Sequence, residues 1–147
     1  MRTIVESIML KFIPIRAQAG ITGFESPAAE YTQIDLDLTQ LLIEHPTATY
    51  IGYAEGESMI DVGIYSGDLL IISRAENVKN NDIIVANLNG VFVVKRVDKP
   101  NKRLLSAAKG YSPYNLQAGD EFQVEGVVTY SIRLHRPLNV VPNVRTV

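Results

Sequence analysis

The stretch IIVANLNGVFVVKRV, residues 83–97, does most to decide the fold of this 147-residue chain. Its two β-branched runs flank Asn89-Gly90, and both residues of that pair tolerate the positive φ angles that a two-residue hairpin turn requires. The stretch therefore predicts a β-hairpin with strands at 83–88 and 91–97. Further runs rich in Val, Ile, Thr and Tyr, separated by Gly, Asn, Asp or Pro, predict strands at 47–54, 69–73, 103–107 and 123–134.

Outside these strands the sequence predicts one short helix, over residues 38–45. Asp37 and Gln40 have the spacing of a capping box, and Pro46 prevents the helix from continuing. The fold class is thus mainly β, with several twisted strands, one short helix and an extended N-terminal arm. We expect the arm to span residues 1–22, the folded domain residues 23–136 and an irregular tail residues 137–147.

The composition excludes several kinds of chemistry. The chain has no cysteine, so disulfides, thiolate metal sites and cysteine nucleophiles are ruled out. Its two histidines, His45 and His135, lie far apart beside predicted element ends, which argues against a histidine-based triad and implies no metal or other cofactor. The net charge is −2, and the central residues 23–126 carry −7, so affinity for DNA through bulk electrostatics is not expected.

The N-terminal stretch does not have the pattern of an export signal. Glu6 and Lys11 interrupt it, so it lacks the uninterrupted run of roughly 7 to 15 apolar residues that such a signal needs. Nothing in the chain approaches the roughly 18 apolar residues of a membrane span. We therefore expect a cytoplasmic protein with no membrane partner.

Lys95 is the residue of the hairpin with the greatest chemical interest. Alternation along the strand places it on the same face as Val93 and Val97. One interpretation is a lysine at a sheet edge, with a buried stem and an ammonium group that reaches water. The other is a partly desolvated lysine, whose pKa is lowered because burial disfavours the charge, so that the neutral amine can accept a proton.

A lysine base requires a nucleophile, and in a chain without cysteine a hydroxyl is the natural choice. Ser58 is the candidate, within the turn GESMID at residues 56–61 that follows a predicted strand. The glycine allows close approach of the backbone, and N–H groups of the turn at Gly56, Glu57 and Met59 are candidates for holding an oxyanion. By itself, a serine in a glycine-containing turn is ordinary.

A second serine and lysine compete with this pair. Ser106 and Lys109 match the Ser-x-x-Lys spacing of penicillin-recognising enzymes, which needs a helical turn and companion Ser-Asp-Asn and Lys-Thr-Gly motifs. The chain lacks both companions. We interpret this spacing as coincidental.

Seven co-linear segments carry a more specific signal than any single motif. They are residues 24–31 (FESPAAEY), 37–50 (DLTQLLIEHPTATY), 56–61 (GESMID), 63–64 (GI), 67–70 (GDLL), 93–96 (VVKR) and 111–113 (YSP). Together they resemble the UmuD family of LexA-like S24 self-cleaving serine peptidases, over about residues 12–134. The resemblance implies the LexA/signal-peptidase-like β fold, with Ser58 as the nucleophile and Lys95 as the general base.

The resemblance also implies a biological setting. In this family the substrate is the protein's own N-terminal arm, which is cut before a glycine when a RecA filament on single-stranded DNA stimulates the reaction. The trimmed homodimer then joins a UmuC-like Y-family DNA polymerase for error-prone translesion synthesis, the mutagenic step of the SOS response. Because no helix-turn-helix segment precedes the body, direct sequence-specific DNA binding is not expected.

Two bonds of the arm are candidates for cleavage. Alignment on residues 24–27 points to Thr22-Gly23, whereas Ala19-Gly20 better matches the small residue expected before the glycine. A β-branched threonine crowds the attacked carbonyl. Moving the cleaved bond by three residues along a flexible arm changes the free energy of presenting it only slightly. We favour Ala19-Gly20 and keep Thr22-Gly23 as the alternative.

Two functions from other classes stay open. One is a non-catalytic polymerase-accessory or regulatory binding module with the same fold and a vestigial dyad. The other is a peptidase that processes different chains, as related signal peptidases do, although no membrane anchor is predicted here.

Overall fold

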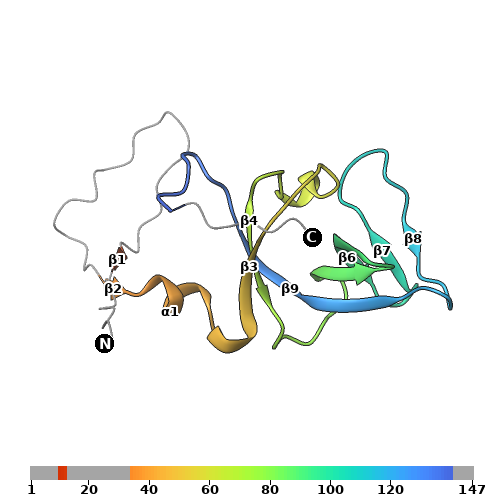
Figure 1. Cartoon of the computed structure of the whole chain (residues 1–147), viewed down its shortest axis with the longest axis horizontal. Coiled ribbons are helices and arrows are strands. Elements are labelled where there is room, and N and C mark those ends of the chain that lie inside the picture. The colour runs from red at the N-terminus through yellow and green to blue at the C-terminus, as the bar shows by residue number, and fades with distance from the viewer. Residues whose placement is uncertain (1–9, 13–33, 141–147) are drawn as a thin grey trace. The chain divides into compact units, whose positions relative to one another are not determined.

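The computed structural model describes residues 10–12 and 34–140 of the chain (Figure 1). They fall into two compact units, one ending at Pro46 and the other beginning at Thr47. The predicted boundary after residue 22 and both candidate cleavage bonds, Ala19-Gly20 and Thr22-Gly23, lie outside the described residues. The three predicted domain ranges therefore stay predictions.

The first unit contains a two-stranded antiparallel sheet and one helix. Strands β1 (Leu10–Phe12) and β2 (Ile34–Leu36) pair with Leu10 opposite Leu36. Neither strand was expected from the sequence, because three residues are too few to show a period. The helix α1 (Leu38–Leu42) follows directly.

The predicted helix over residues 38–45 is correct at its start and too long at its end. Asp37 is the N-cap, and its carboxylate accepts a 3.2 Å hydrogen bond from the backbone N–H of Thr39. The helix ends at Leu42, because Ile43 takes extended backbone angles while its N–H closes the last turn on the carbonyl of Thr39. Pro46 does not end the helix but begins a short 3-10 helix, η1 (Pro46–Ala48).

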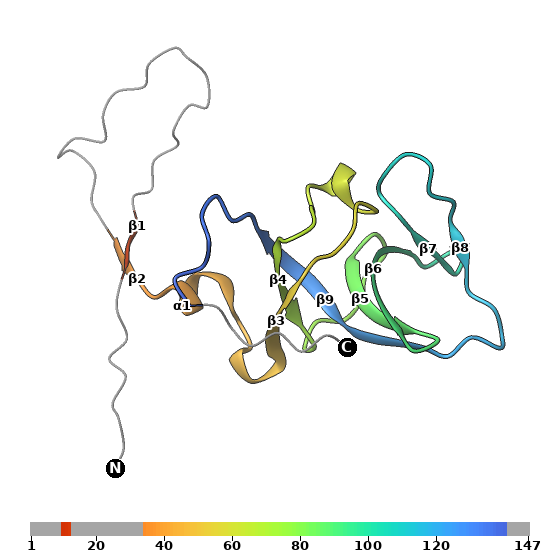
Figure 2. The same cartoon turned by 45° about the horizontal axis from the view of Figure 1, so that its top comes forward.

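The second unit is built on one antiparallel sheet of seven strands (Figure 2). Its spatial order is β3-β4-β9-β5-β6-β7-β8, so β3 and β8 are the edges. The strands are β3 (Thr49–Tyr53), β4 (Leu69–Ser73), β5 (Ile83–Leu88), β6 (Val91–Asp98), β7 (Arg103–Leu105), β8 (Tyr114–Asn115) and β9 (Phe122–Ile132).

The mainly β fold class is confirmed, and the hairpin that predicted it is present. Leu88 pairs with Val91 across a turn in which Asn89 and Gly90 both have positive φ, 52° and 85°. The strands at 69–73 and 83–88 have the predicted bounds, and β6 extends the prediction by one residue. Strand β8 was missed because its two exposed residues carry no alternation.

Two apolar clusters form the core, one on each face of the central strands. Consecutive residues Ile84 and Val85 of β5 belong to different clusters, as alternation along a strand requires. The first cluster comprises Ala54, Met59, Ile64, Leu70, Ile72, Val85 and Ala107. The second comprises Ile84, Ala86, Leu104 and Val127. The first therefore includes Met59, a residue of the turn predicted to carry the nucleophile.

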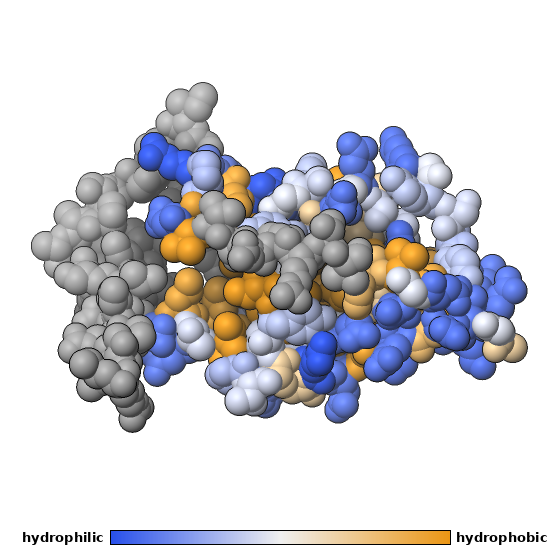
Figure 3. All heavy atoms as spheres, viewed as in Figure 1, coloured by the Kyte–Doolittle hydropathy of each residue, from blue (hydrophilic) through white to orange (hydrophobic). Residues whose placement is uncertain are grey.

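Some apolar side chains stay exposed on this unit. Figure 3 shows hydrophobic residues gathered in the middle of the face in view, and hydrophilic residues over the end that carries β7 and β8. On the edge strand β3, Ile51 is 60% exposed, and Tyr53 beside it and Tyr130 of β9 are also exposed. Among the described residues, no helix combines the length and the apolar character needed to cross a bilayer.

Candidate active site

Ser58 lies in the loop that connects β3 to β4. Gly56 begins the turn with a φ of 91°, and the 3-10 helix η2 (Ile60–Val62) follows the serine. Met59 and Ile64 anchor the loop, because both are buried in the first core cluster. Ser58 itself is half-buried, so its hydroxyl belongs to a turn whose neighbours are fixed by packing.

Residue 107 holds this loop from the other side. The backbone N–H of Ala107 donates a 2.7 Å hydrogen bond to the carbonyl of Ser58, and the N–H of Asp61 donates one of 2.7 Å to the carbonyl of Ala107. Ala107 is also buried in the same cluster as Met59. The position of the Ser58 backbone is therefore set by the segment that follows β7.

An ion pair between the buried Asp68 and the partly exposed Arg133 holds the far end of the loop. Asp68 is 1% exposed, and its carboxylate accepts hydrogen bonds from the guanidinium of Arg133, one of them 3.0 Å long. The same guanidinium donates to the carbonyl of Gly63 at 3.0 Å and lies over the ring of Tyr65. These hydrogen bonds lower the pKa of Asp68, against the opposing effect of its burial. The loop is thus attached to the end of β9.

Lys95 lies on β6, at the half-buried middle of the sheet. Its register partner on β5 is Ile84, which is fully buried. On the other side, Arg96 pairs with Leu105, and this register continues to place Ser106 beside Lys95. The ammonium nitrogen Nζ lies 2.7 Å from Ser106 Oγ and 5.8 Å from the centre of the Tyr111 ring.

Burial of Lys95 disfavours its charged form. Burial lowers the pKa of Lys95 below the ordinary value of 10.5. No carboxylate among residues 37–140 forms an ion pair with it, so no local negative charge opposes this effect. This environment corresponds to the second of the two interpretations that the sequence left open.

The structure connects each predicted catalytic residue to one segment, at two consecutive positions. Ser106 contacts Lys95 through its side chain, and Ala107 contacts Ser58 through its backbone. Within the part of the chain that is described, the hydroxyl of Ser58 and the amine of Lys95 make no hydrogen bond to each other. The segment 106–107 is therefore the physical link between a hydroxyl and a partly desolvated amine.

The turn around Ser58 also offers backbone donors. The N–H groups of Glu57, Ser58 and Met59 donate to no acceptor among the described residues, whereas the N–H of Gly56 donates to Ser66 Oγ at 3.4 Å. Of the predicted turn donors, Glu57 and Met59 are thus available, and Gly56 is engaged. Such available N–H groups are the kind that can stabilise an oxyanion.

The competing spacing Ser106 to Lys109 does not form a helical turn, because residues 106–110 contain no helix. Ser106 nevertheless has a partner that sequence reasoning missed, the amine of Lys95. The signal that could have identified it is the register of β6 with β7, which cannot be deduced from either strand alone. His45 and His135 are both exposed, as expected for residues at element ends.

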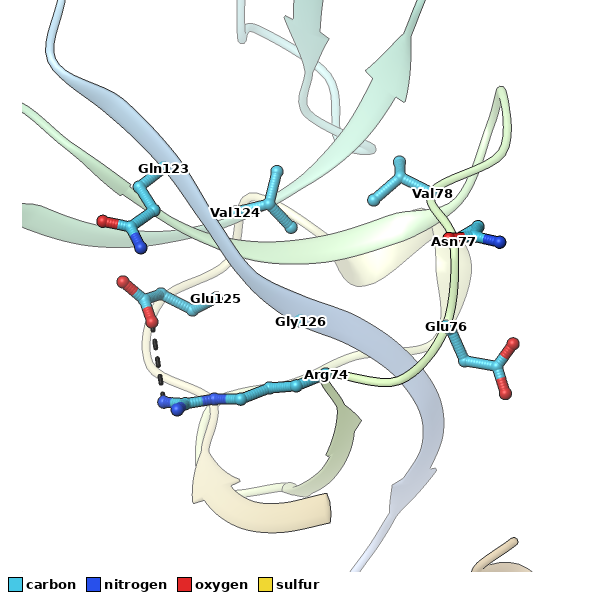
Figure 4. A pocket seen from close by; sticks show the side chains of 8 residues that line it. All are labelled: Arg74, Glu76, Asn77, Val78, Gln123, Val124, Glu125 and Gly126. Carbon is cyan, nitrogen blue, oxygen red and sulfur yellow. Dashed lines mark ion pairs between the residues drawn. The ribbon is translucent and has the colours of Figure 1, made fainter. Parts of the chain in front are cut away.

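A separate shallow cavity of about 380 Å³ lies between the loop after β4 and strand β9. Figure 4 shows Arg74 extended below β9 toward Glu125, with which it forms an ion pair at 3.6 Å. The cavity is lined by Arg74, Glu76, Asn77, Val78, Gln123, Val124, Glu125 and Gly126. Neither Ser58 nor Lys95 lines it, so it does not belong to the candidate active site.

Comparisons with known proteins agree with this architecture. The family model described as Peptidase S24-like matches residues 11–129. Protein SamA of Salmonella typhimurium is 39% identical over 124 residues, covering 84% of this chain and 86% of the relative. Protein ImpA of Escherichia coli is 35% identical, with 85% and 86% covered. The LexA repressor of Bordetella avium is 34% identical over 134 residues, which are 90% of this chain and 62% of the repressor. The chain therefore belongs to the S24 peptidase family.

Proposed function

We propose that this chain is a self-cleaving serine peptidase of the UmuD type, acting in the SOS response to DNA damage. Ser58 is the nucleophile and Lys95 the general base. The observation that carries the proposal is the segment 106–107, which contacts the Lys95 amine through one residue and the Ser58 backbone through the next. Membership of the S24 family supports the same reading.

The proposed reaction proceeds in two steps. The neutral amine of Lys95 takes the proton of the Ser58 hydroxyl as Oγ attacks the carbonyl carbon of the scissile bond. N–H groups of the turn, at Glu57 and Met59, hold the oxyanion, and the protonated amine gives its proton to the leaving nitrogen as the C–N bond breaks. Water then attacks the ester carbonyl while Lys95 accepts a proton from it, and Lys95 returns that proton to Ser58 Oγ as the C–O bond of the ester breaks and the new carboxyl group is released.

The proposed substrate is the N-terminal arm of the same chain or of a partner copy. A tethered arm has a high effective concentration at the site, so a modest nucleophile suffices for a single substrate. We favour cleavage at Ala19-Gly20, with Thr22-Gly23 as the alternative. The mass of the larger fragment distinguishes the two bonds, because Gly20 or Gly23 becomes its first residue.

We further propose three macromolecular partners in the cytoplasm. A RecA filament on single-stranded DNA stimulates cleavage, and the trimmed protein becomes a subunit of a Y-family translesion polymerase. The protein works as a homodimer, which the exposed side chain of Ile51 on β3 supports, since exposed apolar side chains favour association. We expect no direct recognition of a DNA sequence and no cofactor.

A cleavage assay tests the proposal. The purified chain is incubated at mildly alkaline pH, and separately with RecA, single-stranded DNA and a nucleotide, and intact mass is measured by mass spectrometry. We expect conversion to one fragment pair in both incubations, faster with RecA. An unchanged mass in both would contradict the peptidase assignment and favour a non-catalytic polymerase-accessory or regulatory module. Cleavage of added foreign chains without self-cleavage would favour a processing peptidase.

A further inference from the structure

Ser106 is the polar residue with the most direct contact to the proposed base. Its Oγ lies 2.7 Å from Lys95 Nζ, and the two side chains share one face of the β6–β7 pair because the register places them side by side. The Ser-x-x-Lys spacing of Ser106 and Lys109 does not explain this contact, because it pairs Ser106 with a different lysine.

A neutral lysine amine has two N–H donors and one lone pair. As a base it uses the lone pair, which must point at the hydroxyl proton of the nucleophile. The four-carbon stem of lysine is flexible, so an amine without a fixed donor contact samples many orientations. When one N–H of the amine is donated to Ser106 Oγ, much of this rotational freedom is lost. The lone pair then points away from Ser106 and stays available for the proton of the nucleophile.

The backbone places Ser106 where it can serve this purpose. The next residue, Ala107, is hydrogen-bonded to the carbonyl of Ser58 at 2.7 Å and is buried in the core. A shift of Ser106 therefore requires a shift of the Ser58 loop as well. The segment couples the orientation of the amine to the position of the nucleophile.

On this basis we infer that Ser106 is a positioning residue for Lys95, holding the amine by accepting an N–H hydrogen bond while Ser58 Oγ performs the attack. The inference rests on the proposed function, since it assigns Lys95 as the base. Ser106 acts through Lys95 and does not touch the scissile bond. It is therefore distinct from a second nucleophile.

The matched pair Ser106→Thr and Ser106→Val provides the test, because threonine and valine have nearly the same shape and differ in the hydroxyl. Self-cleavage of the full chain is followed by mass spectrometry from about pH 7 to 10. We expect Ser106→Thr to cut within about threefold of the wild-type rate, and Ser106→Val to cut about 10- to 100-fold more slowly, the loss expected from a misplaced catalytic group. Ser131→Ala, an exposed serine on β9, is the matched control and should cut normally.

A second readout does not depend on cleavage. In a Ser58→Ala background, the titration of the Lys95 side chain is measured by NMR on lysine-labelled protein. The Ser106 hydroxyl accepts a hydrogen bond from the ammonium and so favours the charged form of Lys95. Among the described residues, Tyr111 is the titratable group whose side chain faces Lys95. We expect the pKa of Lys95 to be lower with Ser106→Val than with Ser106→Thr. A purely structural role for Ser106 would not separate the two variants.

The outcomes distinguish the inference from the proposed function. Equal cleavage rates and equal Lys95 titrations for the threonine and valine variants would overturn the inference while leaving the dyad intact. If Ser58→Ala still cuts and Ser106→Ala does not, Ser106 is the nucleophile and both assignments fail. If the wild-type chain never cuts, the proposed function fails, and the Lys95 titration alone decides whether Ser106 holds the amine.

If the amide spectrum shows that Ser106→Val does not fold, Ser106→Ala replaces it in both measurements, with the same expected directions.

Discussion

The backbone N–H of Ala107 donates a 2.7 Å hydrogen bond to the carbonyl oxygen of Ser58. The two residues are 49 positions apart in the chain, and Ala107 follows the serine that contacts Lys95. This bond ties the loop that carries Ser58, the proposed nucleophile, to the segment beside Lys95, the proposed base. In the candidate site, residues 106 and 107 contact both proposed catalytic residues: Ser106 contacts the Lys95 side chain, and Ala107 contacts the Ser58 backbone.

Removal of either proposed catalytic group should abolish self-cleavage. Ser58→Ala deletes the attacking oxygen, and Lys95→Ala deletes the proton acceptor, so we expect each to reduce the rate by at least about 1,000-fold, as for other catalytic groups that act as a unit. The rate of fragment formation is measured by mass spectrometry, with circular dichroism to check folding. Lys109→Ala, in the exposed turn after β7, is the control and should cut at the wild-type rate. Full activity of either site variant would contradict the dyad.

Self-cleavage should accelerate as the pH rises. In the proposed mechanism only the neutral amine of Lys95 can accept the Ser58 proton, and burial lowers the pKa of this amine below its ordinary 10.5. The rate is therefore low when the amine is charged, rises as pH approaches that lowered pKa from below, and levels above it. The rate constant is measured across a pH series without RecA. A rate that stays flat between about pH 6 and 10 would remove Lys95 as the base.

Gly126 should tolerate no side chain. It lies in β9 at the register shift beside Val85, and a Cβ built there would lie 2.6 Å from Ile72 Cγ2 and 3.0 Å from the carbonyl oxygen of Ser73. We expect Gly126→Ala to lower the free energy of unfolding by about 1–3 kcal/mol, the usual cost of overpacking. Urea denaturation measures the change.

Gly119→Ala provides the matched control. A Cβ at Gly119 meets no atom within 4 Å, so the free energy of unfolding should change by no more than about 0.5 kcal/mol. Equal changes in the free energy of unfolding at the two glycines would show that the close approach of β9 to β4 does not govern the effect at Gly126.

The ion pair between Asp68 and Arg133 should stabilise the fold only above acid pH. Its hydrogen bonds lower the folded-state pKa of Asp68, so its contribution is complete above the ordinary carboxyl pKa of 3.8 and is lost as pH falls through the lowered value. We expect Asp68→Asn to lower the free energy of unfolding at neutral pH by about 1–3 kcal/mol, because the charged hydrogen bonds to Arg133 are lost. The partial exposure of Arg133 to water limits the size of this loss. Denaturation at neutral and strongly acidic pH should show this deficit shrink toward acid.

Asp61→Asn is the control for that measurement. Asp61 is exposed, so its carboxyl substitution should change stability by no more than about 0.5 kcal/mol at either pH. A deficit for Asp68→Asn that stays constant with pH would mean that shape, and not charge, accounts for its effect.

Local sequence determined the central part of the fold. Asn89-Gly90 predicted the hairpin because few residues tolerate the positive φ angles that both positions adopt, and the alternation of β6 placed Lys95 on the face of Val93 and Val97, which pack on the second cluster. Short elements such as β1, β2 and β8 escaped prediction, since two or three residues hold no period. The predicted helix ran too long because Pro46 was the nearest evident stop, whereas the chain already leaves the helix at Ile43.

The amino-acid sequence alone restricts the chemistry of this protein: without cysteine, and with two separated histidines, a hydroxyl and a lysine are among the few hydrolytic pairs left. What surrounds that lysine depends on how the strands pack in the folded chain. Burial lowers its pKa, and the register of β6 with β7 brings Ser106 to its amine. Desolvation and cross-strand contacts depend on residues distant in sequence, and they exist only once the strands have paired.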